Sequence, residues 1–237
     1  ALGQAKCTYG TGAFLLTNIG SAPKISAHGL ATSLAWNIRG ESAYYLDGQV
    51  FTAATAVQWL IDNDLLDSAE SIDSLPDARG VMAAPGFAGY GAPLWKPHAT
   101  ASIAGLTLSH GKGEIARAMV DGIAAQVADL LGAIAADGVA VNELRVDGGL
   151  TQSHTLMQMQ ADLAQVSIEV YPHPDATAMG VANLAAMATN SALNLGDFAS
   201  AWKPSERYSP KWSADRAQSY LTKWRTLPAN AMESAHE

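Results

Sequence analysis

The chain has 237 residues, a length that suits one large domain or two small ones. Apolar residues make up 49% of it, enough for a sizeable core, and the net charge of −8 without a basic stripe argues against a nucleic-acid partner. Cys7 is the single cysteine, which excludes an internal disulfide and indicates a reducing cytoplasm, and no apolar run approaches the ~18–20 residues of a membrane span.

The first part of the chain is predicted to consist mainly of strands. Alternating apolar residues predict two strands within residues 5–19, joined by a tight turn at residues 10–12. Residues 34–38 and 43–46 are predicted to form a hairpin, and the pair Asp47-Gly48 predicts a further turn. The chain therefore opens with antiparallel strands.

Helices and strands are predicted to alternate from residue 52 onward. Helices are expected over residues 52–66, 114–136, 151–164, 177–189 and 214–224, and strands over residues 81–85, 103–107, 144–146 and 166–170. The helix at 114–136 is the longest, with apolar residues every three or four positions. Strands first, and alternating strands and helices later, indicate a mixed α/β domain.

Two glycine turns are the candidate sites. Gly10 and Gly12 permit a tight turn whose amides, with the Thr11 hydroxyl, can face a phosphate. Gly148 and Gly149 follow a predicted strand and precede a predicted helix, whose first amides and dipole favour anions. Either turn alone is more typical of an ordinary connection. Together, roughly 135 residues apart, they are similar to the nucleotide-binding fold of the actin–hexokinase superfamily.

Four stretches carry a more specific resemblance. They are residues 6–14, residues 51–60, residues 85–97 with 103–107 and 114–121, and residues 145–149 with 156–158. In order and spacing they resemble the C-terminal domain of the FGGY carbohydrate kinases, and among these most closely the glycerol kinases. The resemblance implies an RNase-H-like α/β domain of the actin/hexokinase ATPase type, with a mixed sheet flanked by helices, that binds ATP with Mg²⁺.

The resemblance also implies roles for particular residues. The nucleotide-binding residues would be Gly10, Thr11, Gly12, Ala54, Gln58, Gly148, Gly149 and Ser153. Thr11 would approach the β and γ phosphates, Gly149 would lie against the adenosine, and Phe14 would pack on the carbon face of the substrate. The family often has glycine where Ala54 stands and asparagine where Ser153 stands.

No catalytic or metal-binding residue is expected within residues 1–237. By the resemblance, the general base lies just before the first glycine turn and would precede residue 1, whereas the substrate-binding and Mg²⁺-organising groups belong to an N-terminal domain. We therefore expect this C-terminal domain to be inactive alone, with the N-terminal domain of the same protein as its partner. The protein is also expected to form a homo-oligomer, and neither nucleic acid nor a membrane is expected as a partner.

The expected reaction of the whole enzyme is transfer of the ATP γ-phosphoryl group to a hydroxyl of glycerol. Two alternatives stay open at this point. One is a kinase for a pentulose or another sugar, similar to a xylulokinase, and the other is a non-catalytic nucleotide-binding module. An actin-like or chaperone-like ATPase is disfavoured by the loop at residues 85–97, which matches the kinase pattern.

Structural roles are predicted for several residues outside these turns. Cys7 is expected to be an inert buried thiol, and Asp121 is expected to face away from the apolar stripe of the long helix. Methionines 157, 159 and 179 are expected in the core, and tryptophans 202, 212 and 224 are expected to pin the last helix to the domain.

Overall fold

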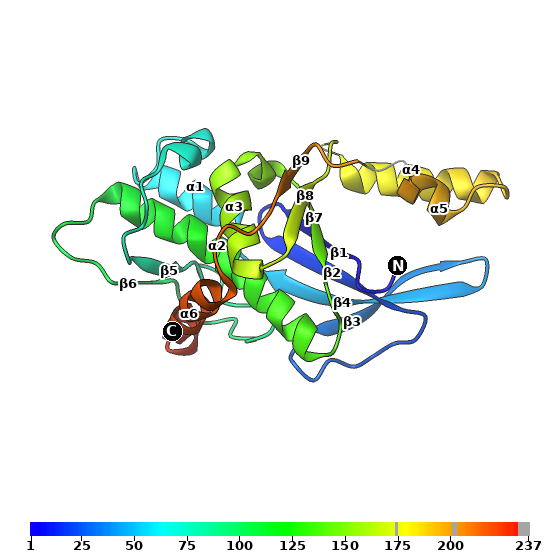
Figure 1. Cartoon of the computed structure of the whole chain (residues 1–237), viewed down its shortest axis with the longest axis horizontal. Coiled ribbons are helices and arrows are strands. Elements are labelled where there is room, and N and C mark those ends of the chain that lie inside the picture. The colour runs from blue at the N-terminus through cyan, green and yellow to red at the C-terminus, as the bar shows by residue number, and fades with distance from the viewer. Residues whose placement is uncertain (174, 201–202, 232–237) are drawn as a thin grey trace.

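A seven-stranded mixed sheet organises the computed structural model, which describes residues 1–173, 175–200 and 203–231 (Figure 1). The strands, in spatial order, are β3 (Ala31–Ile38), β4 (Glu41–Val50), β2 (Ala13–Gly20), β1 (Ala5–Tyr9), β7 (Glu143–Asp147), β8 (Ser167–Val170) and β9 (Glu206–Tyr208). β7 pairs in parallel with β1 and β8, and all other neighbours are antiparallel. The predicted mixed sheet is confirmed. A separate two-stranded sheet joins β5 (Met82–Ala84) to β6 (Ser102–Ala104).

Helices pack against this sheet and extend from one end of it. They are α1 (Ala54–Asp62), α2 (Lys112–Ala136), α3 (His154–Ala164), α4 (Ala176–Thr189), α5 (Leu195–Ser200), α6 (Ala214–Trp224) and α7 (Thr226–Ala229), with the 3-10 helices η1 (Ala69–Ser74) and η2 (Gly149–Gln152). Figure 1 shows α2 and α3 beside the sheet, and α4 and α5 at the end where the β3–β4 hairpin lies. There Arg39, in the turn of that hairpin, donates a hydrogen bond of 3.2 Å to the Met187 carbonyl oxygen of α4. α2 contacts β2 and β4, and α3 contacts β8. The sheet and these helices enclose the core.

The core depends on close approach between α2 and the sheet. The apolar positions that predicted this helix are buried apart from Ile115, which is partly exposed, and Leu130 is among the fully buried side chains. The predicted turn at Asp47-Gly48 is wrong, because β4 continues through it to Val50. A Cβ on Gly48 would lie 2.7 Å from Leu130 Cδ2, so this glycine makes room for α2.

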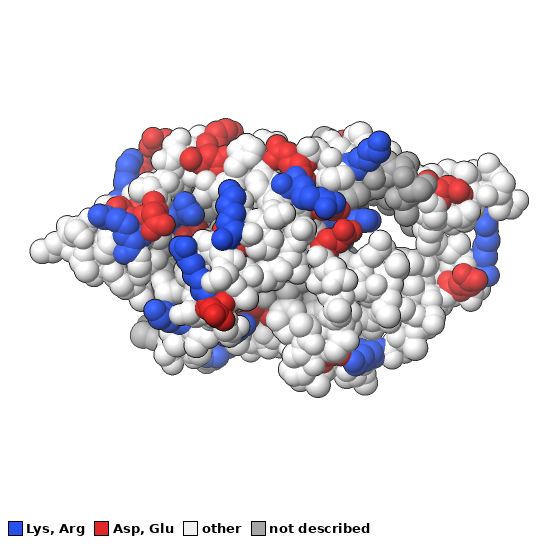
Figure 2. Space-filling model, viewed as in Figure 1, with Lys and Arg blue, Asp and Glu red and all other residues white. Residues whose placement is uncertain are grey.

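The length and composition of α2 would also allow it to cross a membrane, although no apolar stretch of that length was expected from the sequence. Its most apolar 18-residue window has a mean hydropathy of 1.5. However, 78% of that window is buried within the domain, as is typical of the central helix of a packed core. Figure 2 shows charges of both signs interspersed over the face in view, with no continuous basic stripe on that face.

Asp121 is buried in α2, although it was predicted to face away from the apolar stripe. It is 5% exposed and accepts a hydrogen bond of 2.8 Å from Arg117 Nε, one helical turn earlier. Burial raises the pKa of Asp121 to about 6, against the lowering effect of Arg117, and nearby Asp77 adds to the rise. The folded protein therefore holds this proton more tightly than the unfolded chain does.

Replacing Asp121 with asparagine is expected to remove a pH-dependent contribution to the free energy of unfolding. Since the folded form binds more protons between about pH 4 and 6, stability from this group falls as pH rises through that range and is level above it. Relative to the wild type, Asp121→Asn should therefore gain about 3 kcal/mol between pH 4 and 7. Urea unfolding of both proteins across this range checks the prediction, and a difference independent of pH would contradict it.

The structure also tests the predictions for the single cysteine and for the methionines. Cys7 is fully buried, and burial raises the pKa of its thiol to about 12, consistent with an inert group. Met157 and Met159 are buried as predicted, whereas the prediction for Met179 is wrong because its side chain is exposed on α4. Trp202 lies outside the described residues.

Candidate functional site

The two glycine turns meet at one edge of the sheet. β1 and β7 are parallel neighbours, and Thr8 pairs with Asp147 near their carboxyl ends. The Gly10–Gly12 turn (residues 10–12) follows β1, and Gly148 and Gly149 follow β7. Because parallel neighbours end at the same edge, turns separated by more than 130 residues in sequence lie side by side.

The glycines of the second turn serve different purposes. Gly148 has φ +100°, and a Cβ there would lie 2.3 Å from the carbonyl oxygen of Tyr9. Only glycine therefore allows the turn to pack on the end of β1. At Gly149, by contrast, no heavy atom outside the adjoining stretch of chain lies within 4 Å of the position a Cβ would take. Gly149 thus borders open space that another molecule can occupy.

A pocket of about 560 Å³ lies between the two turns. It is lined by Tyr9, Gly10, Thr11, Ala54, Ala69, Glu70, Ile72, Asp73, Gly149, Leu150, Gln152 and Ser153. Five predicted site residues are thereby brought together: Gly10, Thr11, Ala54, Gly149 and Ser153. They come from the two turns, from the start of α1 and from the residue that precedes α3.

The remaining predicted site residues lie outside this lining. Gly12 is buried beneath its turn, where a Cβ would be 2.4 Å from the Val50 carbonyl oxygen. Gln58 is exposed on α1 and donates a hydrogen bond of 2.7 Å to Asp62. Phe14 is exposed on β2, just beyond the first turn. Gly12 and Gly148 thus shape the turns without bordering the pocket.

The first turn is fixed to α1 through its carbonyl groups. The carbonyl oxygen of Gly10 accepts a hydrogen bond from Ala54 N, and that of Thr11 accepts from Ala53 N and from Thr55 N and Oγ1. In the described part of the chain, the amides of residues 10–12 donate to no protein partner. The amides of Gly10 and Thr11 and the exposed Thr11 side chain thus leave donors beside the pocket, an arrangement suited to an anion.

The opposite wall is held by Asp73, which links η1 to the start of α3. Its Oδ1 accepts hydrogen bonds from Ser153 Oγ (2.9 Å) and Thr155 N (2.8 Å), and its Oδ2 accepts from His154 N (3.1 Å). Burial raises the pKa of Asp73, but these hydrogen bonds outweigh it and hold the pKa below its ordinary value. The carboxylate is therefore ionised at neutral pH.

Glu70, Ile72 and Asp73 were not predicted as site residues. The segment containing them was expected to be an acidic stretch with helix fragments at best, yet η1 packs against α3 and Ile72 is buried. Asp73 meets its hydrogen-bond partners across about 80 residues of sequence. No local pattern indicates such a contact, and only the acidic character of the segment hinted at its capping role.

Comparisons with known proteins identify the family. Residues 5–189 match the model of the C-terminal domain of the FGGY family of carbohydrate kinases. A glycerol kinase of Aromatoleum aromaticum is 41% identical over 231 residues, covering 95% of this chain and 47% of its own length. One from Alkalilimnicola ehrlichii is 43% identical over 228 residues, covering 94% and 46%. The chain spans about half the length of the curated relatives it matches.

Solved structures agree with this assignment. The glycerol kinase of Plasmodium falciparum, solved with ADP, superposes with a TM-score of 0.89 at 30% identity, covering 99% of this chain and 48% of that one. A xylulose kinase from Rhodospirillum rubrum, at 20% identity and a TM-score of 0.79 over 97% and 47% of the two chains, shares the fold. The RNase-H-like architecture is therefore confirmed, and the chain belongs to the FGGY family of carbohydrate kinases.

Proposed function

We propose that this chain is the ATP-binding half of a kinase that transfers the γ-phosphoryl group of ATP to a hydroxyl of glycerol. The observation that carries the proposal is the pocket in which the two glycine turns meet. The identity of about 40% with proteins named glycerol kinase favours glycerol as the substrate.

The pocket offers a distinct environment for each part of a nucleotide. The unpartnered amides of the Gly10–Gly12 turn and the Thr11 hydroxyl would bind the β and γ phosphates. The open space beside Gly149 would receive the adenosine, with Ala54 on the facing wall. Phe14, exposed beyond the first turn, would contact the carbon face of the substrate.

Mg²⁺ would enter with the nucleotide phosphates. Among the described residues no group of three or more histidine, cysteine, aspartate or glutamate side chains is placed to hold a metal ion. The ion would neutralise charge on the phosphates during transfer. In this proposal the acidic groups that organise it belong to the N-terminal domain.

The other half of the enzyme would supply the chemistry that this chain lacks. The relatives are about twice as long, which supports an N-terminal domain of the same protein as the partner. That domain would carry the general base and most substrate contacts, so residues 1–237 alone would be inactive. Assembly as a homo-oligomer and a cytoplasmic location remain predictions from the sequence.

A steady-state assay of the full-length protein tests this function. With Mg-ATP, we expect glycerol to be phosphorylated with a higher kcat/KM than xylulose, and the isolated chain to release no ADP above background. Faster turnover of xylulose would favour the pentulose kinase. Nucleotide binding without phosphorylation of either substrate would favour the non-catalytic module.

A further inference from the structure

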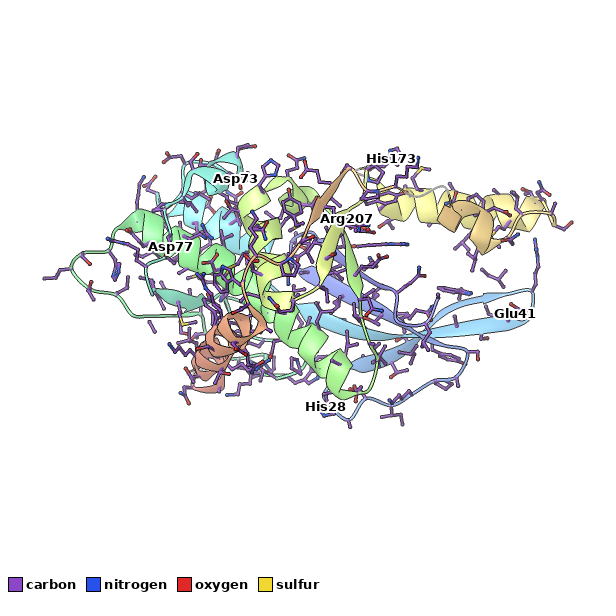
Figure 3. The ribbon with its side chains drawn as sticks, viewed as in Figure 1. His28, Glu41, Asp73, Asp77, His173 and Arg207 are labelled. Carbon is purple, nitrogen blue, oxygen red and sulfur yellow. The ribbon has the colours of Figure 1, made fainter. Side chains whose placement is uncertain are left out.

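Asp73 caps the start of α3 and also lines the pocket, so its carboxylate can contact a bound ligand. Figure 3 labels it where η1 meets the start of α3, and its carboxylate borders the pocket together with Ser153 and Gln152. Three hydrogen bonds from the start of α3 fix the orientation of this carboxylate. An exposed aspartate held in this way presents a rigid acceptor to any molecule in the pocket.

The hydrogen bonds around Ser153 determine which donors remain available. The single proton of its hydroxyl goes to Asp73 Oδ1, and the same oxygen accepts from Leu156 N at 3.2 Å. Ser153 therefore has no proton left for a bound base. The amides of His154 and Thr155 are likewise engaged by Asp73. The donors at the start of α3 are therefore already used by Asp73, and the group that remains available to a ligand there is the Asp73 carboxylate, an acceptor.

Asp73 itself keeps spare capacity to accept. A carboxylate oxygen has two lone-pair directions, and Oδ2 accepts one hydrogen bond, from His154 N. The nearby Thr151 hydroxyl donates to the Gly148 carbonyl at 2.7 Å and is also engaged. A base entering beside Gly149 thus meets an anionic acceptor at Asp73, while the hydroxyls of Ser153 and Thr151 have no proton left to donate and Gln152 is the side-chain amide on this wall.

We propose that Asp73 determines base specificity, its carboxylate accepting a hydrogen bond from the exocyclic amino group of adenine and disfavouring a 6-oxopurine. This inference rests on the proposed function, because it assumes that the pocket binds a nucleotide. A carbonyl at the same position would direct its lone pairs at the carboxylate. Since Asp73 is exposed, solvent screening limits the expected preference to about tenfold.

Calorimetric titration of the wild-type chain with Mg-ADP and Mg-IDP tests the preference directly. The two ligands share the ribose and the diphosphate and differ at the purine six-position and its neighbouring nitrogen. We expect ADP to bind about tenfold more tightly than IDP. Equal affinities would overturn the inference while leaving the proposed function intact, whereas no binding of either would count against both.

Two variants separate specificity from capping. Asp73→Asn keeps the size of the side chain but replaces one carboxylate oxygen by an amide group that donates, which gives up the hydrogen bond from His154 N. Mg-ADP should therefore bind more weakly, Mg-IDP should lose less affinity, and the ratio of the two affinities should approach one. If Asp73 only caps α3, both ligands would weaken by the same factor and the inference would fail. Glu70→Gln is the matched control, because it removes the same charge from the same pocket but from a carboxylate that bonds Ser68, and the ratio should stay unchanged.

Discussion

Replacing Gly149 with aspartate is expected to abolish the binding of Mg-ADP, with a loss of affinity of at least about 100-fold. The new side chain would project into the open space beside the turn, where the adenosine is proposed to lie. It would also bring a carboxylate toward a ligand that already carries negative charge. Isothermal titration of the wild-type and variant chains measures the loss.

The fold should survive this change, which makes the result interpretable. Apart from the adjoining stretch of chain, no heavy atom of the protein lies within 4 Å of the Cβ position at Gly149. Gly180 on α4 is equally open and lies outside the pocket lining, so Gly180→Asp introduces the same charge elsewhere. We expect that control to bind Mg-ADP like the wild type. Retention of binding by Gly149→Asp would exclude the turn as the adenosine site.

The largest effect on stability is expected from Trp224→Ala, a loss of about 3–5 kcal/mol in the free energy of unfolding. The Trp224 side chain is 1% exposed, and its Nε1 donates a hydrogen bond of 2.9 Å to the Ala83 carbonyl oxygen. The substitution would leave a large cavity between α6 and β5 and an unpaired buried carbonyl. Denaturation by urea measures the change.

Trp212 provides the control for this second prediction. It is half-buried, stacks under the Arg216 guanidinium at 3.8 Å and meets the Tyr220 ring edge-on. Because much less surface is buried, Trp212→Ala should cost about 1–2 kcal/mol. Equal losses at the two positions would show that Trp224 is not the main attachment of the C-terminal helix to the domain.

The periodicity of apolar residues predicted the strands and helices whose own sequence carries that periodicity. Alternation gave β1 and β2, and helical spacing gave α2, while α6 has the predicted limits of residues 214 and 224. β9 was not predicted, because its three residues Glu-Arg-Tyr have no strand pattern. It forms by pairing with β8, where Arg207 forms an ion pair with the buried Glu169. Such an element depends on a partner that is distant in sequence.

The candidate site likewise has a part that was predicted from local sequence and a part that was not. Its two turns were identified from glycines at particular places, and five of the predicted residues do line one pocket. The wall formed by η1 was missed because Asp73 acquires its role only when α3 folds against it. That these residues bind a nucleotide is a prediction, and the titrations with Mg-ADP test it.

The adjacency of β1 and β7 has a consequence for motion. The strands that carry the two turns, β1 and β7, share one ladder of hydrogen bonds, and β1 is the fourth of seven strands in the sheet. A site built from surface loops opens by local fluctuation, whereas these turns separate only when the middle of the sheet comes apart. A substitution that weakens the pairing of β1 with β7 is therefore expected to shorten the time for which the pocket keeps its shape, even where every contact in the pocket is unchanged.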